Sequence, residues 1–365
     1  MDERSPFPFL EGFRVLDLTN ENGMFLGKLL GDSSADVIKI ELPGGDHARK
    51  IGPFYHDTIN TEKSLFWFAF NLNKRGITLN IETEQGRGIF KRMVRTADFV
   101  LESSEPGYLD SIGLGYSNLE RINPRIILTS ITPFGQTGPY AKWKATDLIG
   151  LSMGGLTHFH SERDRVGTRF SQNQFYEMGA IYGYAGTMMA HYHREITGEG
   201  QHVDVSCQEA VCNSLMQTSE CWDISKVNPA AAGDGFLIAR PTPPGPVHVK
   251  AVWETKDGYC VIWLFAGGAA AGITQSSTML TLWGNEEGYM MELKDFDWST
   301  FNMATVMQDE KDAQDKQLQE FLKTKTNREL AERALKDSLF LMPVSRPSEV
   351  VNSPQFNARG VWVDL

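Results

Sequence analysis

Cysteine is scarce in this sequence. Only Cys207, Cys212, Cys221 and Cys260 occur among 365 residues, and no two of them form a C-x-x-C pair. No histidine stands at metal-finger spacing from two of them. Two histidine pairs with one residue between them are poor joint ligands, because such spacing on a helix turns the side chains to different faces. We therefore expect no metal site, and we expect the cysteines to be buried, reduced thiols.

Basic residues are also in short supply. The chain has 35 Lys+Arg against 46 Asp+Glu, which gives a formal net charge of −11. Nucleic acid is excluded as the main partner, because phosphate backbones need a basic surface. No stretch approaches 18 apolar residues, so no membrane span is expected. Residues 1–6 are acidic and lack the apolar centre of a secretory signal, which predicts a cytoplasmic protein.

What the sequence does contain is an alternation of short apolar strands and amphipathic helices over its first 135 residues. Such alternation predicts an α/β fold, with a doubly wound, Rossmann-like parallel sheet covered by helices on both faces. The expected strands are 13–19, 35–41, 76–81, 97–102 and 125–131, and the expected helices are 24–30, 85–96 and 119–123.

Ligands of such folds bind where the strands end. The loops to consider are 20–23, 42–46, 103–107 and 132–144. No G-x-G-x-x-G follows the first strand and no Walker sequence occurs, so neither usual nucleotide-phosphate cradle is indicated.

The second half of the chain changes character. A long helix over 176–195 carries many small residues, which predicts the close approach of another backbone, from this chain or from a partner. Residues 228–247 are rich in Gly and Pro and predict a loop or crossing. The expected domains are a large α/β domain at 1–225, a crossing at 226–247 and a smaller α/β domain at 248–365. Further expected elements are helix 147–156, strand 202–206, a hairpin around 256–258, helical structure over 315–337 and a strand at 360–365.

Eight segments together resemble one family, and they occur in that family's order. The chain is similar to class III CoA-transferases of the formyl-CoA transferase and carnitine CoA-transferase type. The segments are VLDLT (15–19), ADVIKIE (35–41), NLNKRG (71–76), GLGY (113–116), NPR (123–125), FGQTGPY (134–140), TGEGQHVDVS (197–206) and GVW (360–362).

The resemblance implies two α/β domains in each chain and two ring-like chains threaded through each other as an interlocked dimer. It implies a CoA thioester as substrate, with no tightly bound cofactor, and an aspartate that attacks the thioester to give enzyme-bound anhydride and thioester intermediates. The positions that it implies for CoA contact are Glu21, Asn22, Leu79, Lys144 and Ala145.

This chain departs from the family at the decisive position. Counting back without gaps from the TGEGQ segment, the nucleophile position falls on Tyr176, and the nearest carboxylate is Glu177. A phenol with a pKa near 10 cannot simply replace a carboxylate at neutral pH. Other positions where the family has cationic or stacking contacts have changed as well, which predicts weakened CoA binding. They are Leu42, Glu82, Ser103, Ser104 and Ser111.

Three interpretations remain open at this point. The chain can be the non-catalytic subunit of a heteromeric transferase, of the benzylsuccinate CoA-transferase kind, whose homologous partner carries the aspartate. It can be an active homodimeric transferase or isomerase that uses Glu177 or another carboxylate. It can also be a binding or regulatory protein that kept the fold and lost catalysis. The acid substrate is not readable from the sequence.

Overall fold

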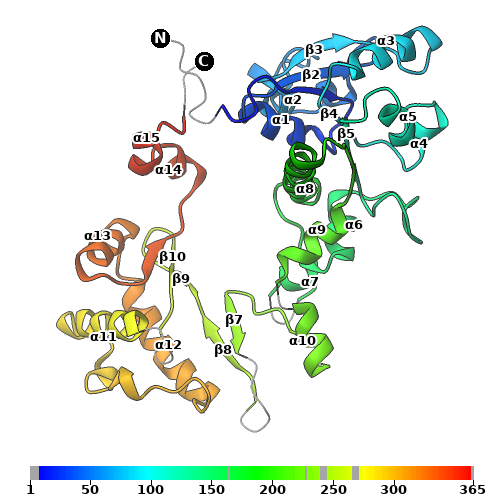
Figure 1. Cartoon of the computed structure of the whole chain (residues 1–365). Helices are drawn as coiled ribbons and strands as arrows, with labels where there is room; N and C mark the ends of the chain where they lie inside the picture. The colour runs from blue at the N-terminus through cyan, green and yellow to red at the C-terminus, as the bar shows by residue number, and fades with distance from the viewer. Residues whose placement is uncertain are drawn as a thin grey trace. The chain divides into compact units, whose positions relative to one another are not determined.

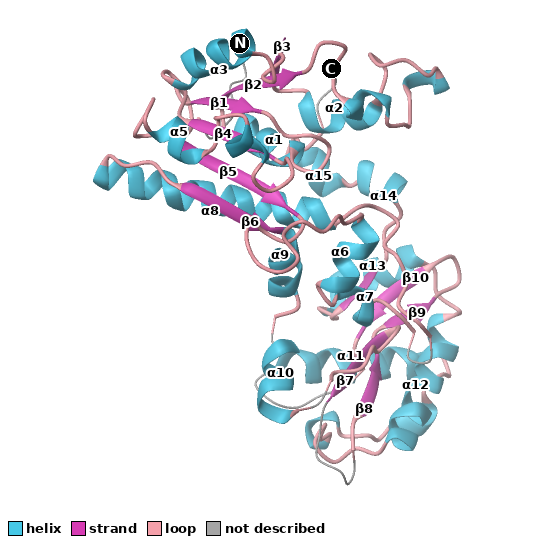
Figure 2. Cartoon of the chain, turned by 90° about the vertical axis from the view of Figure 1, so that its right-hand side faces the viewer, coloured by secondary structure: helices cyan, strands magenta, loops and turns pink. Residues whose placement is uncertain are grey.

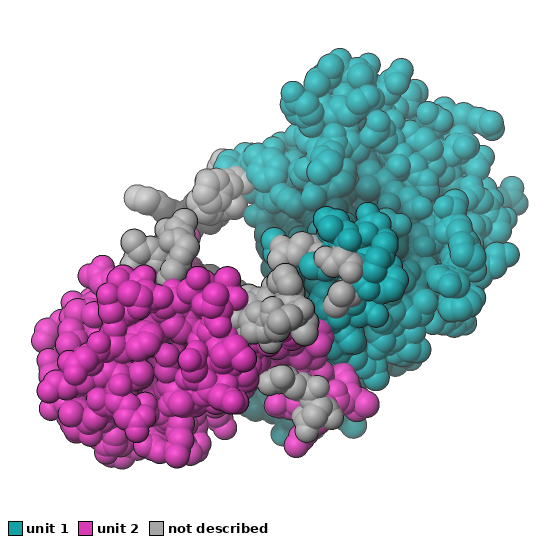
Figure 3. All heavy atoms as spheres, turned by 90° about the horizontal axis from the view of Figure 1, so that it is seen from below, with its two compact units in different colours: residues 1–160, 168–229 teal, residues 161–167, 230–365 magenta. Residues whose placement is uncertain are grey.

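The computed structural model describes residues 8–162, 165–216, 218–226, 228–238, 245–264 and 271–362. The chain divides into two compact units, drawn in teal and magenta in Figure 3. Unit 1 comprises Met1–His160 and Thr168–Pro229, and unit 2 comprises Ser161–Gly167 and Ala230–Leu365. The domain limits 1–225 and 248–365 stay a prediction of the sequence.

Unit 1 is built on a six-stranded sheet in which every pairing is parallel (Figure 1). The spatial order β3-β2-β1-β4-β5-β6 is that of doubly wound folds, which confirms the predicted fold class. The strands are β1 (Arg14–Asp17), β2 (Asp36–Glu41), β3 (Arg75–Thr78), β4 (Phe99–Glu102), β5 (Ile127–Thr132) and β6 (His202–Ser206). The sequence predicted the last strand but not its place at the edge of this sheet.

Helices cover both faces of the sheet because the strands are apolar on both sides. On one face, α1 (Met24–Asp32) and α8 (Phe175–Thr197) pack against β-strand residues such as Phe99 and Ile131. On the other face, α3 (Glu84–Val94) and α5 (Tyr116–Glu120) pack against Val100 and its neighbours. The remaining helices of unit 1 are α2 (Leu65–Asn71), α4 (Tyr108–Ser111), α6 (Asp147–Met153), α7 (Leu156–Phe159), α9 (Cys207–Ser214) and α10 (Thr218–Ser225).

The small residues of α8 serve packing within this chain. Figure 2 shows α8 running along β5 and β6. A Cβ on Gly179 would clash with Cys207 Sγ, and one on Gly183 would lie 3.3 Å from Leu26. A Cβ on Gly186 would lie 2.9 Å from a Val203 methyl. The close approach expected from the sequence is therefore the approach of α8 to this chain's own α9, α1 and β6.

Unit 2 has two small antiparallel sheets. β7 (Gly235–Ile238) pairs with β8 (Val247–Lys250), and a second sheet has the order β11-β10-β9. The predicted hairpin around 256–258 is confirmed, since β9 and β10 pair on either side of it. The second sheet's strands are β9 (Val252–Glu254), β10 (Tyr259–Ile262) and β11 (Leu341–Pro343).

The helices of unit 2 surround an aromatic core that contains Trp253, Trp283, Trp298 and Phe321. The segment 315–337 is divided between two helices because Thr326 caps the start of the second, where its side chain accepts from Glu329 N. The helices are α11 (Ala271–Glu286), α12 (Gln308–Leu322), α13 (Asn327–Asp337), α14 (Pro347–Val351) and α15 (Pro354–Ala358).

Three expectations need correction. The Gly/Pro-rich segment 228–247 is not all loop, because β7 lies in it and pairs with β8. No strand occurs at 360–362, where two residues follow a turn without regular structure, and 363–365 lie outside the described residues. Cys212 is exposed rather than buried, since it follows the inward-facing Val211 on α9 and the next helical residue turns outward. Cys221 is only half-buried, whereas Cys207 and Cys260 are buried as expected. All four cysteines are free.

Two findings about absent features concern the described residues alone. Every helix in them is too short or too polar to cross a bilayer. No three or more His, Cys, Asp and Glu side chains in the same part of the chain are grouped to hold a metal ion.

Candidate active site

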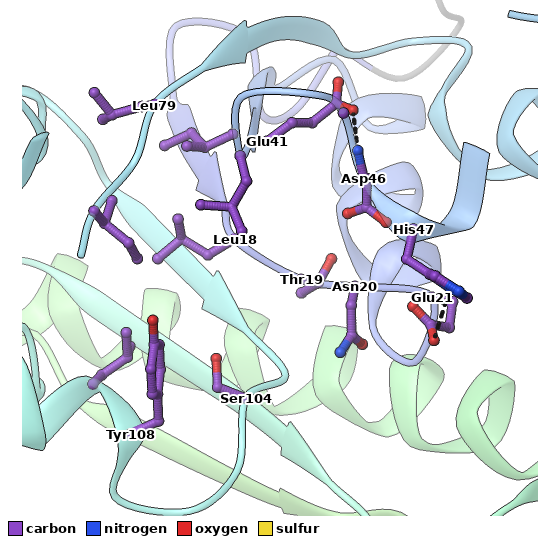
Figure 4. A pocket seen from close by; sticks show the side chains of 15 residues that line it. Leu18, Thr19, Asn20, Glu21, Glu41, Asp46, His47, Leu79, Ser104 and Tyr108 are labelled. Carbon is purple, nitrogen blue, oxygen red and sulfur yellow. Dashed lines mark hydrogen bonds and ion pairs between the residues drawn. The ribbon is translucent and has the colours of Figure 1, made fainter. Parts of the chain in front are cut away.

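A first cavity of about 360 Å³ opens at the carboxyl edge of the sheet (Figure 4). Its walls come from the loops after β1, β2, β3 and β4, at the point where the strand order reverses between β1 and β4. Ligands of doubly wound folds bind at this place. The lining residues are Leu18, Thr19, Asn20, Glu21, Ile40, Glu41, Leu42, Gly45, Asp46, His47, Leu79, Ile81, Ser104, Tyr108 and Leu109.

Two of the carboxylates that line the first cavity, Glu41 and Asp46, are paired with cations. Arg49 donates to both oxygens of Glu41 at 2.6 and 2.9 Å, and its guanidinium lies 4.0 Å from the Trp67 ring centroid. Burial alone would raise the pKa of Glu41, but the Arg49 hydrogen bond helps to hold it below its ordinary value. Lys39 Nζ lies 3.4 Å from Asp46 Oδ2. The cations nearest the cavity are therefore already committed to the protein's own acids.

A buried ion network lies beneath these loops. Lys74 Nζ donates to Asp17 Oδ2 at 2.9 Å and to Met24 O at 2.8 Å, and both charged side chains are almost fully buried. Lys39 donates to Thr19 O. Burial would raise the pKa of Asp17, but Lys74 and Lys39 outweigh it and lower that pKa. The network ties the loops after β1 and β2 to the sheet.

A second cavity of about 590 Å³ contains the position of the expected nucleophile. It adjoins the first, because Glu21 lines both cavities. The lining residues are Glu21, Asn22, Ile51, Phe66, Ala145, Thr146, Asp147, Leu148, Arg169, Asn173, Tyr176 and Glu177.

Tyr176 stands at the start of α8 and is tied to the wall of the second cavity. Its hydroxyl donates to Ala145 O at 2.9 Å. Burial raises the pKa of Tyr176 well above its ordinary value, and the charges of Cys207, Glu21 and Asp147 act in the same direction. The phenol is therefore neutral at physiological pH and cannot act as a carboxylate nucleophile.

Two carboxyl groups of the second cavity have oxygens without partners. Asp147 accepts from Gln174 N at 2.6 Å and from Phe175 N at 2.9 Å through Oδ1, which caps the start of α8. Its Oδ2 has no hydrogen-bond partner, although the residue is only 9% exposed. Glu177 Oε2 is buried without a partner as well. Burial first, and the Asp147 charge second, raise the pKa of Glu177.

The expected CoA contacts are only partly brought together. Glu21, Asn22 and Ala145 line the second cavity with Tyr176, whereas Leu79 lines the first. Lys144 is 88% exposed, lines neither cavity, and lies 3.3 Å from a Glu105 oxygen.

The substituted positions are occupied by local interactions. Ser103 Oγ donates to Asn20 Oδ1 at 2.8 Å, and Ser111 Oγ donates to Tyr108 O at 2.6 Å. Glu82 accepts from Tyr108 Oη at 3.1 Å. Leu42 and Ser104 line the first cavity without adding a charge.

Two functional candidates were missed by sequence reasoning. Asp147 is the first residue of α6, where an acidic side chain is usually a cap or a first-turn charge, yet it accepts hydrogen bonds at the start of the later helix α8 and lines the second cavity. Among the described residues that line this cavity, Arg169 is the only basic one. Nothing in the sequence distinguished Arg169 from other loop arginines.

The model of CoA-transferase family III matches residues 10–365. The chain belongs to this family. The resemblance found in the motifs is thus confirmed across nearly the whole chain, and the Rossmann-like sheet is the class III transferase fold.

Several curated family members resemble the chain. It is 35% identical to the BbsE subunit of succinyl-CoA:(R)-benzylsuccinate CoA-transferase from Thauera aromatica, over 70% of this chain and 64% of that protein. It is 38% identical to acetyl-CoA:oxalate CoA-transferase of Acetobacter aceti, over 64% of this chain and 59% of that protein. It is 29% identical to succinate–glutarate CoA-transferase of Agrobacterium fabrum over 98% of the chain. The match thus spans under two thirds of the first two relatives' length.

Solved structures of the family superimpose on the chain. The superposition with a CaiB/BaiF family protein from Brucella suis covers 98% of this chain and 89% of that protein's chain, with a TM-score of 0.80 and 30% identity. A crystal structure of Rv3272 from Mycobacterium tuberculosis, at 23% identity and a TM-score of 0.72, shares the fold.

Proposed function

We propose that this chain is a subunit of a class III CoA-transferase that moves CoA between carboxylic acids, for example from succinyl-CoA to an aryl- or alkyl-succinate. A homologous subunit carries the aspartate nucleophile, and this chain is non-catalytic. The likeness to BbsE, which is itself a subunit of a benzylsuccinate enzyme, supports both the substrate class and the subunit role.

One observation carries the proposal. At position 176, where the motif spacing places the family's aspartate, stands a tyrosine that is hydrogen-bonded to Ala145 O and stays neutral because burial raises its pKa. A neutral phenol held by a carbonyl has neither the charge nor the free oxygen that attack on a thioester requires.

The chemistry is therefore assigned to the partner. Its aspartate oxygen attacks the thioester carbonyl and the C–S bond breaks. CoA departs as the thiolate, and a mixed anhydride of the aspartate and the acyl group remains on the enzyme. The thiolate then attacks the aspartyl carbonyl of that anhydride and releases the first acid. The second acid attacks the resulting aspartyl thioester, its C–S bond breaks, and a second mixed anhydride forms as CoA thiolate is released. The thiolate finally attacks the acyl carbonyl of this anhydride, which gives the new acyl-CoA and frees the aspartate. CoA is a substrate throughout, and no bound cofactor is needed.

An exposed apolar stripe on α8 supports the assignment of a partner. Met189 is 71% and Tyr192 is 72% exposed, and both lie on one helix face. Apolar stripes of this length on a surface helix mark protein interfaces. The further exposed apolar members are Ile181, Tyr182 and Ile196. We propose that this face packs in an interlocked hetero-oligomer, and that the chain alone is poorly soluble or self-associates. A well-behaved monomer at micromolar concentration, measured by light scattering, would contradict this assembly.

A second candidate function is favoured by Glu177. This carboxyl lines the second cavity, and its Oε2 has no partner, so it is the best-placed alternative nucleophile next to Tyr176. The chain would then be an active homodimeric transferase or isomerase. A binding or regulatory protein without catalysis is the remaining alternative.

One experiment separates these functions. The chain is purified alone and with its co-expressed homologous subunit, incubated with acyl-CoA, and trapped with hydroxylamine or borohydride before mass spectrometry. We expect an adduct on the partner's aspartate and none on this chain. An adduct on Glu177, lost in Glu177→Gln, would establish the second candidate instead. No adduct on either subunit would favour the regulatory interpretation.

A further inference from the structure

The two cavities meet at one residue. Glu21 is the only side chain shared by the walls of both, among the residues that the structure describes. A ligand long enough to occupy both cavities, as a CoA thioester is, must pass this carboxylate. Its charge therefore acts on every such ligand, whichever end enters first.

The negative charge of Glu21 is less well neutralised by neighbouring cations than the charges of the other acids that line the first cavity. Glu41 is paired with Arg49 at 2.6 Å, and Asp46 with Lys39 at 3.4 Å. Within the described residues, only His47 lies within ion-pair distance of Glu21, with Nδ1 at 3.9 Å from Oε1 (Figure 4). The His47 side chain is 72% exposed, so water screens its influence.

The loop that carries Glu21 is held on both sides. Asn20 N donates to Ser103 Oγ at 2.9 Å, and Asn22 N donates to Asn20 Oδ1 at 3.0 Å. Just before them, Thr19 N donates to Asp17 Oδ1 at 2.9 Å, which joins the loop to the buried ion network. The backbone that carries Glu21 is therefore anchored beside the junction of the two cavities.

We propose that Glu21 is a specificity-determining residue, a fixed negative charge that disfavours phosphorylated ligands such as CoA thioesters in this chain's own site. This inference rests on the proposed non-catalytic role and deepens it: the chain lacks the nucleophile and also repels the anionic substrate, which leaves the partner's site to bind it. Ligands of similar shape that carry no phosphate are not subject to this repulsion.

The test measures binding to the full-length chain by calorimetry, for wild type, Glu21→Gln, Glu21→Asp and the control Glu11→Gln. Glu11 is exposed and precedes β1, at the opposite edge of the sheet. Removing one uncompensated like charge at contact distance should tighten CoA binding about tenfold. Glu21→Asp keeps the charge and should bind CoA as weakly as wild type, and Glu11→Gln should change nothing.

Two further readouts separate charge from shape. Pantetheine, which has no phosphate, should bind wild type and Glu21→Gln equally. Raising the salt concentration should tighten CoA binding to wild type by screening the repulsion, and should do so less in Glu21→Gln. Unchanged or weaker CoA binding in Glu21→Gln would overturn the proposal, as would an equal gain for pantetheine. Either result leaves the adduct experiment on the partner's aspartate unaffected, so the two proposals fail separately.

Discussion

The first and second cavities differ in how their charges are compensated. In the first, Glu41 and Asp46 are each paired with a cation that comes from the strands or loops around them. In the second, Asp147 and Glu177 each keep a buried oxygen without a partner. Paired charges hold the loops in place, whereas unpaired ones cost free energy unless a ligand or proton satisfies them. The first cavity thus has the character of a framework, whereas the second holds carboxyl oxygens that a ligand or a proton would satisfy.

The sharpest way to probe this comparison is to place a carboxylate at position 176 in the second cavity. In Tyr176→Asp, at acyl-CoA concentrations high enough to overcome the repulsion by Glu21, we expect the chain to form a covalent adduct that wild type does not form, because the substituted carboxylate faces the same cavity as Asn22 and Ala145. Mass spectrometry after hydroxylamine trapping measures it. Tyr176→Asn is the matched control and should stay free of adduct. An intact, folded Tyr176→Asp chain without adduct, at saturating acyl-CoA, would show that more than the nucleophile has been lost.

The framework character of the first cavity predicts a large effect on stability. Lys74→Met removes one partner of a fully buried ion pair and leaves Asp17 with Lys39 alone, at 3.9 Å. Breaking such a pair costs about 3–5 kcal/mol. Urea unfolding of the purified protein measures the loss. Lys144→Met, at an exposed lysine, should cost less than about 1 kcal/mol. Equal effects of the two substitutions would remove the distinction between framework and surface charges.

The smallest expected effect concerns protonation in the second cavity. Burial raises the pKa of Glu177, so the folded protein holds this proton more tightly than the unfolded chain. Its contribution favours folding at acidic pH and is lost as the pH rises through the raised pKa. Glu177→Gln removes this dependence. We expect the variant and wild type to have the same melting temperature near pH 4. At pH 8 the variant should melt about 2–4 °C higher than wild type, which corresponds to about 1 kcal/mol of stability. The prediction is wrong if calorimetry shows that the melting temperatures of the variant and of wild type change in parallel with pH.

Local patterns were sufficient to predict much of unit 1. Strands 13–19 and 35–41 and helix 24–30 were predicted because each is a short apolar or amphipathic run bounded by turn residues, and β1, β2 and α1 occur there. The small residues of α8 also indicated close packing, but the structure was needed to show that Cys207 and Val203 of this chain fill the space. The periodicity of a helix indicates which of its faces is packed, but not which surface packs against that face.

The site was predictable only as far as the family motifs reach. They indicated Tyr176, Glu177, Glu21, Asn22 and Ala145, which line the second cavity, and Leu79, which lines the first. They also indicated Lys144, whose side chain is exposed and extends to Glu105 instead. A position in a motif fixes the backbone location, while the direction of a long, flexible side chain depends on the charges around it.

The sequence by itself determined the alternation of strands and helices that builds the sheet from β1 to β5, the membership of the family and the presence of a tyrosine at position 176. These properties depend on residue identity and local spacing. Only the tertiary structure decided that β6 completes the sheet, that Asp147 caps α8 rather than serving its own helix, and that Glu21 joins two cavities. Each of these depends on groups far apart in the chain, brought together by burial of apolar strand faces, which no local pattern encodes.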